Sequence, residues 1–286
     1  MTHSQRTALS GLMAFFTATP MVFGWGTQGH RTVALVAQGI ISPATAQAIN
    51  DLTGGLQLTD LATCPDEIRV AQSTTSPNCR KVFPAKNPAS EPWHFINLDV
   101  STPSPNNTAE DQICASNCVV SKIVEFAAKV GDKTASKSDR LQALSYLVHF
   151  VGDVHQPLHA AERNKDEGGN KVFVKLNRKQ VKLHAAWDTG IVLLIGPNES
   201  AIASAIAPEI ATAKLETPKA ASDWAHDWAR ESLTDAINAA YKGVPPTPVT
   251  TLDANYQAAA KTLIRTQLAK GGYRLAVLLD NAFAGK

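Results

Sequence analysis

The sequence predicts a mainly α-helical fold that contains one small β-hairpin. Three observations lead to this prediction. Helix-capping residues precede several segments, apolar residues recur behind them at helical spacing, and one short stretch alternates polar and apolar residues instead. With 286 residues, the chain is long enough to bury one large core, and we find no repeat or linker that divides it.

The first 24 residues have the layout of a cleaved signal peptide. A short polar and basic lead (residues 1–6) precedes an apolar run (residues 8–23), and the small Gly24 stands at a cleavage point. The run is too short and too interrupted for a membrane span; the alternative is a buried N-terminal helix. We therefore expect a secreted or periplasmic protein without stable membrane association, whose single domain covers residues 25–286 and begins at Trp25.

Helices are predicted wherever a cap stands before apolar residues at helical spacing. Ser42 followed by Pro43 opens one helix, and Ser138 or Asp139 opens the next clear one, which Pro157 should end. Asp253 can cap a long Ala- and Leu-rich C-terminal segment, which we expect the glycine pair 271–272 to interrupt. Residues 171–176 and 180–183 alternate around Asn177-Arg178-Lys179, which indicates the hairpin.

The charge and the cysteines narrow the class of protein. A formal charge of +2 excludes the broad basic surface of a typical duplex-DNA binder, so any affinity for phosphates must be local. Four cysteines in an exported chain indicate two disulfides, for which three pairings are possible. We favour the two short loops, Cys64–Cys79 and Cys114–Cys118. A thiolate zinc site is the alternative, although neither pair has the CxxC spacing.

Two pairs of histidine and aspartate carry the chemistry. His149 and Asp153 are four residues apart, as are His184 and Asp188, and His159 follows Pro157 at a point where the chain can turn back. On a helix this spacing places both side chains on one face. One such pair is more often a core histidine or a surface ion pair. Two pairs and His159 within forty residues indicate a metal site, and imidazole with carboxylate suits catalytic zinc. We interpret His155 as structural.

Further candidates lie upstream, and each has a structural alternative. His30 follows Trp25 by five residues, and Asp66 opens the sequence Asp66-Glu-Ile-Arg69. Asp66 could simply cap a helix and Arg69 could be its solvated partner. His94 begins His94-Phe95-Ile96-Asn97 and could pack on the preceding tryptophan.

Taken together, these residues resemble the S1/P1 nuclease family, and their order and spacing match from residue 25 to about 232. The resemblance implies a phospholipase C/P1 nuclease-type helical fold with three Zn²⁺ ions. It implies Asp66, His94, His149 and Asp153 as ligands of the first ion, and His159, His184 and Asp188 as ligands of the second. The third would take His30, the amine and carbonyl of Trp25, and the other oxygen of Asp153. The motifs that carry the resemblance are Trp25…His30, Asp66-x-x-Arg69, His94-Phe-Ile, His149-Phe-x-Gly-Asp153-x-x-Gln-Pro-Leu-His159, Gly168-Gly-Asn170, Leu-His184-x-x-Trp-Asp188 and Trp228-Ala-Arg-Glu-Ser.

The same resemblance implies an enzyme, a zinc-dependent endonuclease. It would hydrolyse phosphodiester bonds of single-stranded DNA and RNA by metal-activated water, release 5′-phosphorylated products and also accept 3′-nucleotides. Asp153 and Arg69 would be catalytic, and we expect a monomer. Phe95 would stack a base beside Gly168, Gly169, Asn170 and Asn97. The structural alternatives are core packing for Phe95 and a tight turn for the glycines. Some family members have Asp where this chain has Asn97, so base preference does not carry over.

Two other functions remain open. A zinc-dependent phospholipase C shares the fold, although the short spacing from Trp25 to His30, the carboxylate of Asp188 and the predicted base site favour a nuclease. A non-catalytic exported zinc-binding protein would bind metal without turnover, but a non-ligand donor such as Arg69 beside the metals argues against it.

Overall fold

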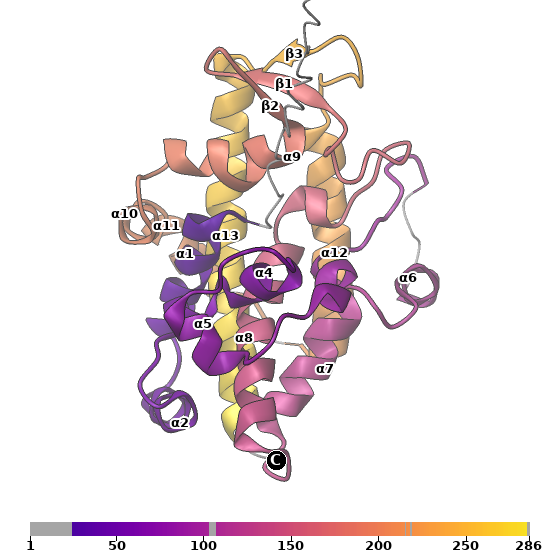
Figure 1. Cartoon of the computed structure of the whole chain (residues 1–286). Helices are drawn as coiled ribbons and strands as arrows, with labels where there is room; N and C mark the ends of the chain where they lie inside the picture. Colours follow the sequence, from indigo (N-terminus) through magenta and orange to yellow (C-terminus); the bar gives the residue numbers. More distant parts are fainter. Residues whose placement is uncertain (1–24, 103–106, 215, 218, 285–286) are drawn as a thin grey trace, which may run out of the picture.

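The long helices α8 (Lys137–Val154) and α13 (Ala254–Ala284) run through the body of the molecule, and shorter helices surround them (Figure 1). The computed structural model describes residues 25–102, 107–214, 216–217 and 219–284, so the predicted signal peptide lies outside the described residues. The prediction of a mainly α-helical fold is confirmed. In chain order the helices are α1 (Thr27–Gln38), α2 (Pro43–Thr53), α3 (Leu58–Leu61), α4 (Cys64–Arg69), α5 (Pro77–Val82), η1 (Pro88–His94), α6 (Asn107–Cys114), α7 (Val119–Gly131), α8 (Lys137–Val154), η2 (Pro157–His159), α9 (Leu183–Ala185), η3 (Ala186–Gly190), η4 (Val192–Leu194), α10 (Glu199–Ala205), α11 (Ala207–Ala213), α12 (Ala221–Asp235), η5 (Ala236–Ala240) and α13 (Ala254–Ala284).

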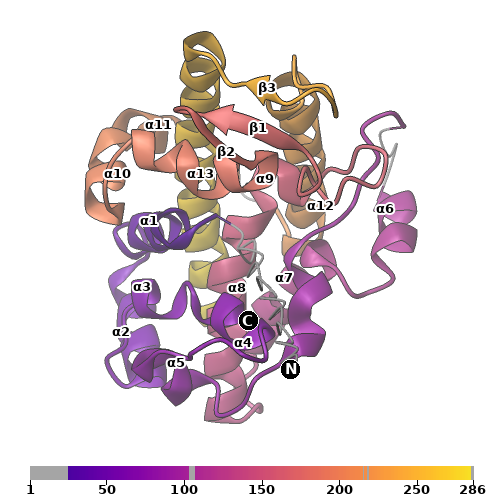
Figure 2. The same cartoon turned by 45° about the horizontal axis from the view of Figure 1, so that its top comes forward.

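The predicted hairpin is confirmed and forms part of a three-stranded sheet. Strands β1 (Phe173–Leu176) and β2 (Lys179–Lys182) pair antiparallel, and the short β3 (Thr250–Thr251) adds to β1 in parallel. The turn residues Asn177 and Arg178 have φ angles of 49° and 69°, which is the backbone of a two-residue hairpin turn. The sheet lies at one end of the molecule, above α9 (Figures 1 and 2).

The caps follow the predictions with one correction. The Ser42 side chain accepts a hydrogen bond from the Thr45 amide, and Asp253 accepts one from the Tyr256 amide at 2.8 Å. The cap of α8, however, is Ser136 and not Ser138 or Asp139. Asp139 lies in the first turn, where its own amide donates to the Ser136 hydroxyl at 3.0 Å. Asp139 is therefore the residue whose amide is capped, and not the capping residue.

The prediction that Gly271 and Gly272 interrupt the C-terminal helix is wrong, because α13 is continuous from Ala254 to Ala284. These glycines serve packing instead. A Cβ atom on Gly272 would come within 2.4 Å of the Val36 side chain on α1, and one on Gly271 would meet the His155 ring at 3.4 Å. Gly272 therefore lets α1 pack closely on α13, whereas the contacts at Gly271 are at ordinary van der Waals distance.

A continuous hydrophobic core extends from Trp25 to Leu279. Both predicted disulfides are present: Cys64–Cys79 joins α4 to α5, and Cys114–Cys118 links α6 to the start of α7. Within the described ranges, the helices are all too short or too polar to cross a membrane.

Candidate metal centre

The centre is built on the C-terminal half of α8, which is buried on all sides. His149 and Asp153 lie one turn apart there, with His149 Nε2 3.2 Å from Asp153 Oδ2 and no exposed surface on either residue. As predicted, the helix ends before Pro157, and the following turn η2 returns His159 toward the helix. His159 Nδ1 then lies 3.5 Å from Asp153 Oδ1.

A first cluster forms where α4 and η1 meet α8. Asp66 from α4 and His94 from η1 approach His149, whose Nε2 lies 3.0 Å from His94 Nδ1 and 3.6 Å from Asp66 Oδ1. His94 Nδ1 is also 3.0 Å from Asp153 Oδ2. Ligand atoms that bind zinc tetrahedrally at about 2.0–2.1 Å are separated from each other by about 3.3 Å. The spacing of Asp66, His94 and His149 therefore fits one ion, and Asp153 Oδ2 adjoins this group through His94 and His149.

A second cluster combines His159 with His184 and Asp188. The Nε2 atoms of the two histidines are 3.0 Å apart, and His184 Nε2 is 3.4 Å from Asp188 Oδ2. His184 lies on α9 and Asp188 on the π-helical turn η3 that follows it directly. These three residues, all buried, form a group able to hold a cation.

A third group surrounds His30 of α1. His30 Nε2 lies 3.3 Å from Asp153 Oδ1, while the other oxygen of Asp153 faces the first cluster. The side chains that can share an ion here are His30, His149 and Asp153. The expected partner Trp25 would act through main-chain atoms, so its ligation stays a prediction. Trp25 is fully buried, and the next residue, Gly26, donates its amide to the Asp188 carbonyl at 2.8 Å.

Backbone carbonyls fix the orientation of three of the imidazoles. The Nδ1 atoms of His149, His159 and His184 each lie 2.7 Å from a carbonyl oxygen. Because a carbonyl can only accept, each Nδ1 carries the proton and each Nε2 is left as a lone-pair donor toward the cluster. The carbonyls belong to Ala62, His94 and Gly168, respectively.

The charge states also suit cation binding. Burial lowers the pKa of His94 to about 3 and lowers the pKa of His184 well below its usual value, so both rings are neutral. Burial would raise the pKa of Asp153, but its electrostatic contacts with the rings of His149 and His159 outweigh burial and hold that pKa well below the usual value. Asp188 is the exception, because burial raises its pKa well above the usual value, and a cation bound beside it would favour the ionised carboxylate.

The remaining unsatisfied atoms indicate what the centre lacks. Nε2 of His30, Oδ1 of Asp153 and Oδ2 of Asp188, which all face the groups described above, are buried without a hydrogen bond. Buried polar atoms are rarely left unpaired in a native protein. Neutral imidazoles and carboxylates with unused lone pairs fit bound zinc, so the residues present fit the expected group.

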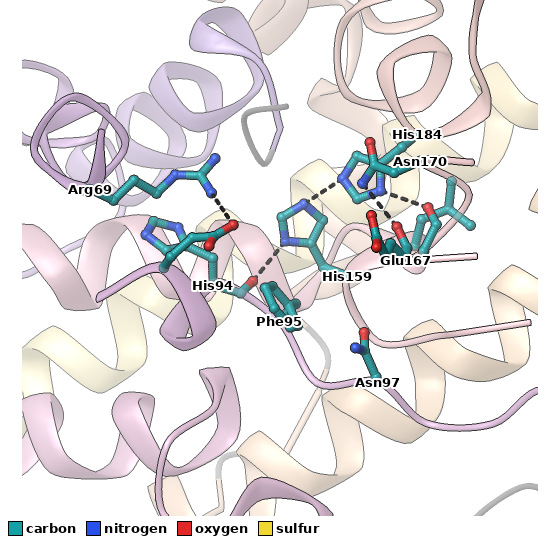
Figure 3. Close-up of a pocket in the computed structure, with 11 residues that line it drawn as sticks. Arg69, His94, Phe95, Asn97, His159, Glu167, Asn170 and His184 are labelled. Carbon is teal, nitrogen blue, oxygen red and sulfur yellow. Dashed lines mark hydrogen bonds and ion pairs between the residues drawn. The ribbon is translucent and has the colours of Figure 1, made fainter. Parts of the chain in front are cut away.

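A cavity of about 400 Å³ opens beside the clusters (Figure 3). Arg69 lies next to His94 on one side, and His184 and Asn170 lie on the other. Phe95 is only partly buried and lines the cavity, so core packing is not its environment. The cavity is lined by Arg69, Glu91, His94, Phe95, Asn97, Leu158, His159, Glu167, Gly168, Asn170 and His184.

The glycines of the expected base site have different surroundings. Gly168 and Gly169 have φ angles of 59° and 80°, so the expected tight turn is present. Gly168 lines the cavity, and a Cβ there would come within 2.4 Å of the Leu158 carbonyl. Gly169 is absent from the lining and packs on Leu183 instead.

Three polar residues near the centre were assigned no role in the sequence analysis. Glu91 and Glu167 line the cavity, and Glu91 Oε1 lies 3.6 Å from Arg69 Nη1. Nothing in the sequence separates these two from ordinary surface acids. Gln156 is fully buried and donates to the Asp188 carboxylate at 2.5 Å. His155, by contrast, is structural as expected: its Nδ1 donates to the Val151 carbonyl, and Arg274 donates to its Nε2 at 2.8 Å.

Comparisons with known proteins agree with a hydrolytic metal centre. A family model described as S1/P1 Nuclease matches residues 25–284, so the chain belongs to this family, whose members are hydrolases acting on phosphodiester bonds. Nuclease S1 from Aspergillus oryzae is 26% identical over 280 residues, which cover 91% of this chain and 92% of that protein. Nuclease P1 from Penicillium citrinum is 34% identical over 169 residues, 58% of this chain and 57% of that protein. Endonuclease 2 from Arabidopsis thaliana is 27% identical over 287 residues, 93% of each chain. The family favours a nuclease over the phospholipase and the non-catalytic zinc-binding protein.

Proposed function

We propose that this chain is an exported nuclease with three zinc ions that cleaves single-stranded DNA and RNA to 5′-phosphorylated products and also acts on 3′-nucleotides. The observation that carries the proposal is the position of the buried His/Asp clusters beside a cavity that Arg69 and Phe95 also line. The names of the relatives, nucleases S1 and P1 and endonuclease 2, support it. We propose a single catalytic domain over residues 25–286.

The clusters would hold the zinc ions in the sets already described. Asp153 would bridge two ions, because its two oxygens face different groups. Three Zn²⁺ bring six positive charges, which the carboxylates of Asp66, Asp153 and Asp188 only partly offset. The resulting local excess can attract a phosphodiester without a basic surface. When bound, the zinc ions would supply activation of the attacking water and charge stabilisation of the leaving 3′ oxygen.

Arg69 would meet the charge that develops on the phosphoryl oxygens. Its Nε donates to Asp66 Oδ1 at 3.0 Å, and this contact fixes the guanidinium at the edge of the cavity. A planar fork of donors in that position suits a phosphoryl group. Phe95 would stack a base on the same side, a contact that contributes about 1–3 kcal/mol and tolerates any base. Asn97, Gly168 and Asn170 would meet the base edge, with Gly169 shaping their turn.

The hairpin supplies local positive charge for a longer strand. Residues 171–182 contain five basic residues and no acidic one, in a chain with a net charge of only +2. This segment contains strands β1 and β2, and it joins Asn170 to His184, which both line the cavity. Phosphates that follow the scissile bond can therefore meet lysine and arginine side chains there.

Export is supported by the leader-like sequence before Trp25 and by two disulfides, which persist in oxidising compartments. Zinc uptake at the third group would then follow leader removal, because only a free Trp25 amine can chelate.

The decisive experiment compares substrates and metal content on the mature protein. We expect three zinc ions per chain, hydrolysis of single-stranded DNA and RNA, and loss of hydrolysis after chelation that Zn²⁺ restores. Phosphatidylcholine in mixed micelles is the competing substrate. Preferential cleavage of that lipid, or nuclease activity that survives complete removal of metal, would overturn the proposal.

A further inference from the structure

Gln156 joins two parts of the metal centre although it cannot itself be a good zinc ligand. It lies between Asp153 and His159 and is fully buried. Its backbone amide donates to the Asp153 carbonyl at 2.9 Å, and its carbonyl accepts from the His159 amide at 2.9 Å. The backbone of Gln156 therefore belongs to the turn that directs both residues.

The side chain of Gln156 is held in one orientation. Its Oε1 accepts the Leu158 amide at 2.6 Å, so the amide group cannot be flipped without losing this bond. The Nε2 must then point away from Leu158, and it donates to Asp188 Oδ1 at 2.5 Å. A carboxamide held at both ends is a rigid spacer between the turn and the carboxylate.

This contact selects one oxygen of Asp188. With Oδ1 bound by Gln156, Oδ2 is left buried without a hydrogen bond, 3.4 Å from His184 Nε2. A free carboxylate can rotate and present either oxygen, or both, to an ion. The Gln156 donor removes that freedom and aims a single oxygen at His159 and His184.

We propose that Gln156 is a positioning residue for the second metal group: it fixes Asp188 as a one-oxygen ligand and couples this group to the end of α8, which carries Asp153. The inference rests on the proposed function, since it assumes that His159, His184 and Asp188 hold zinc. It adds a specific dependence of that one ion on a residue that does not touch it.

The test measures Zn²⁺ affinity in the full mature chain. Gln156→Met preserves length and approximate volume but removes the donor. We expect the zinc ion at His159, His184 and Asp188 to bind about 10–100-fold more weakly, as is usual when a hydrogen-bond partner of a ligand is lost. The other two ions should remain tightly bound. Chelators of graded strength and metal analysis after dialysis give the affinities, and circular dichroism verifies the fold.

A second buried glutamine provides the matched control. Gln267 is 1% exposed and its amide donates to Glu231 and Asp235 on α12, away from the clusters. Gln267→Met should reduce thermal stability but leave all three zinc affinities unchanged. A general effect of losing a buried amide would lower zinc affinity in both variants, and that result would overturn the proposal.

A double-mutant cycle tests whether Gln156 acts through Asp188. In an Asp188→Ala background, Gln156→Met should cause little further loss of zinc affinity. Should Gln156→Met not fold, Gln156→Asn, whose amide is too short to reach Asp188, takes its place with the same expected result. Wild-type affinity for all three ions in the folded variant overturns this inference alone, whereas absence of zinc from the wild type overturns the proposed function as well.

Discussion

At the residue level, the protonation states of two histidines already suit the binding of a cation. The imidazoles of His159 and His184 are held neutral by burial and donate their Nδ1 protons to fixed carbonyls. The ring nitrogens that face the clusters therefore carry free lone pairs, and zinc can bind to them without first displacing a proton. The roles of Arg69 and Trp25 can be tested against this background, one as a donor to substrate and one as a ligand.

Replacement of Arg69 by alanine should separate catalysis from metal binding. We expect hydrolysis of single-stranded DNA to fall about 100-fold or more, the usual effect of losing one donor to the developing charge. Zinc content should stay at the wild-type value, because Arg69 contacts Asp66 without being a ligand. Arg69→Lys should be intermediate, since it keeps the charge and loses the planar fork. Arg80→Ala, an exposed change on α5, is the control; unchanged hydrolysis by Arg69→Ala would make Arg69 structural.

A methionine retained before Trp25 should weaken the third zinc group. The amine of a free N-terminus has a pKa of about 7.7–8.0 and loses its proton to zinc readily, whereas a peptide amide is a very poor ligand. We expect lower zinc content and lower activity in protein made without a leader and with Met preceding Trp25. The same chain released from a fusion so that it begins at Trp25 is the comparison. Equal zinc content and turnover in the two forms would contradict the role of the N-terminus.

At the level of elements, the position of His30 depends on how closely α1 packs on α13. Val36 of α1 occupies the space that a side chain at position 272 would need. Glycine at position 272 therefore lets α1, the helix that carries His30, pack closely on α13.

Gly272→Ala should consequently disturb both packing and metal binding. The added methyl group has to displace Val36, and overpacking of this kind costs about 1–3 kcal/mol of stability. We also expect the zinc bound at His30 to be released more readily to chelators, with smaller effects on the ion at His184. Gly39→Ala at the end of α1 is the matched control, since its nearest neighbour would be at 3.6 Å. Equal zinc retention in the two variants would show that α1 adjusts without moving His30.

The sequence predicted what local rules determine and missed what packing determines. The four-residue spacing correctly predicted that His149 lies beside Asp153, and Pro157 correctly predicted where the helix ends. Both features depend on neighbouring residues alone. Gly272 was misread because the side chain that excludes a larger residue there, Val36, lies on α1, more than 200 residues earlier. Gln156 was part of a recognised motif, but only distances reveal its contact with Asp188. The gathering of the candidate ligands was predicted from the family pattern, and their zinc ligation stays a prediction.

At the level of the whole molecule, a network of charges joins α12 to α13. Arg274 contacts Glu216 and Glu231, and Lys270 also contacts Glu231. Asp235 is on the edge of this network, where Gln267 donates to it at 2.5 Å. Burial, together with the negative charge of Glu231 and despite the Gln267 contact, raises the pKa of Asp235 to about 6.

Asp235→Asn should stabilise the protein at neutral pH. A carboxyl group whose pKa is about 6 in the fold and 3.8 in the reference state binds a proton more tightly when folded. Stability is therefore lost as pH rises from about 4 to 6, and above 6 the full penalty remains. Allowing for partial exposure, we expect a gain of about 1 kcal/mol at pH 8 and almost none at pH 4. Thermal melts with saturating zinc at both pH values measure this, and an equal gain at both would refute the assignment.

The Cys64–Cys79 bridge has a consequence for the order in which the protein matures. It fastens the segment that supplies Asp66, Arg69 and the Ala62 carbonyl that orients His149. Before oxidation that covalent link is absent, and the two free cysteines would offer softer zinc ligands than any carboxylate in the centre. Zinc present before oxidation would bind their thiolates instead of the ligands of the centre. We therefore expect the disulfide to form before metal binds at the proposed centre, and a chain made in a reducing compartment to bind metal without assembling that centre.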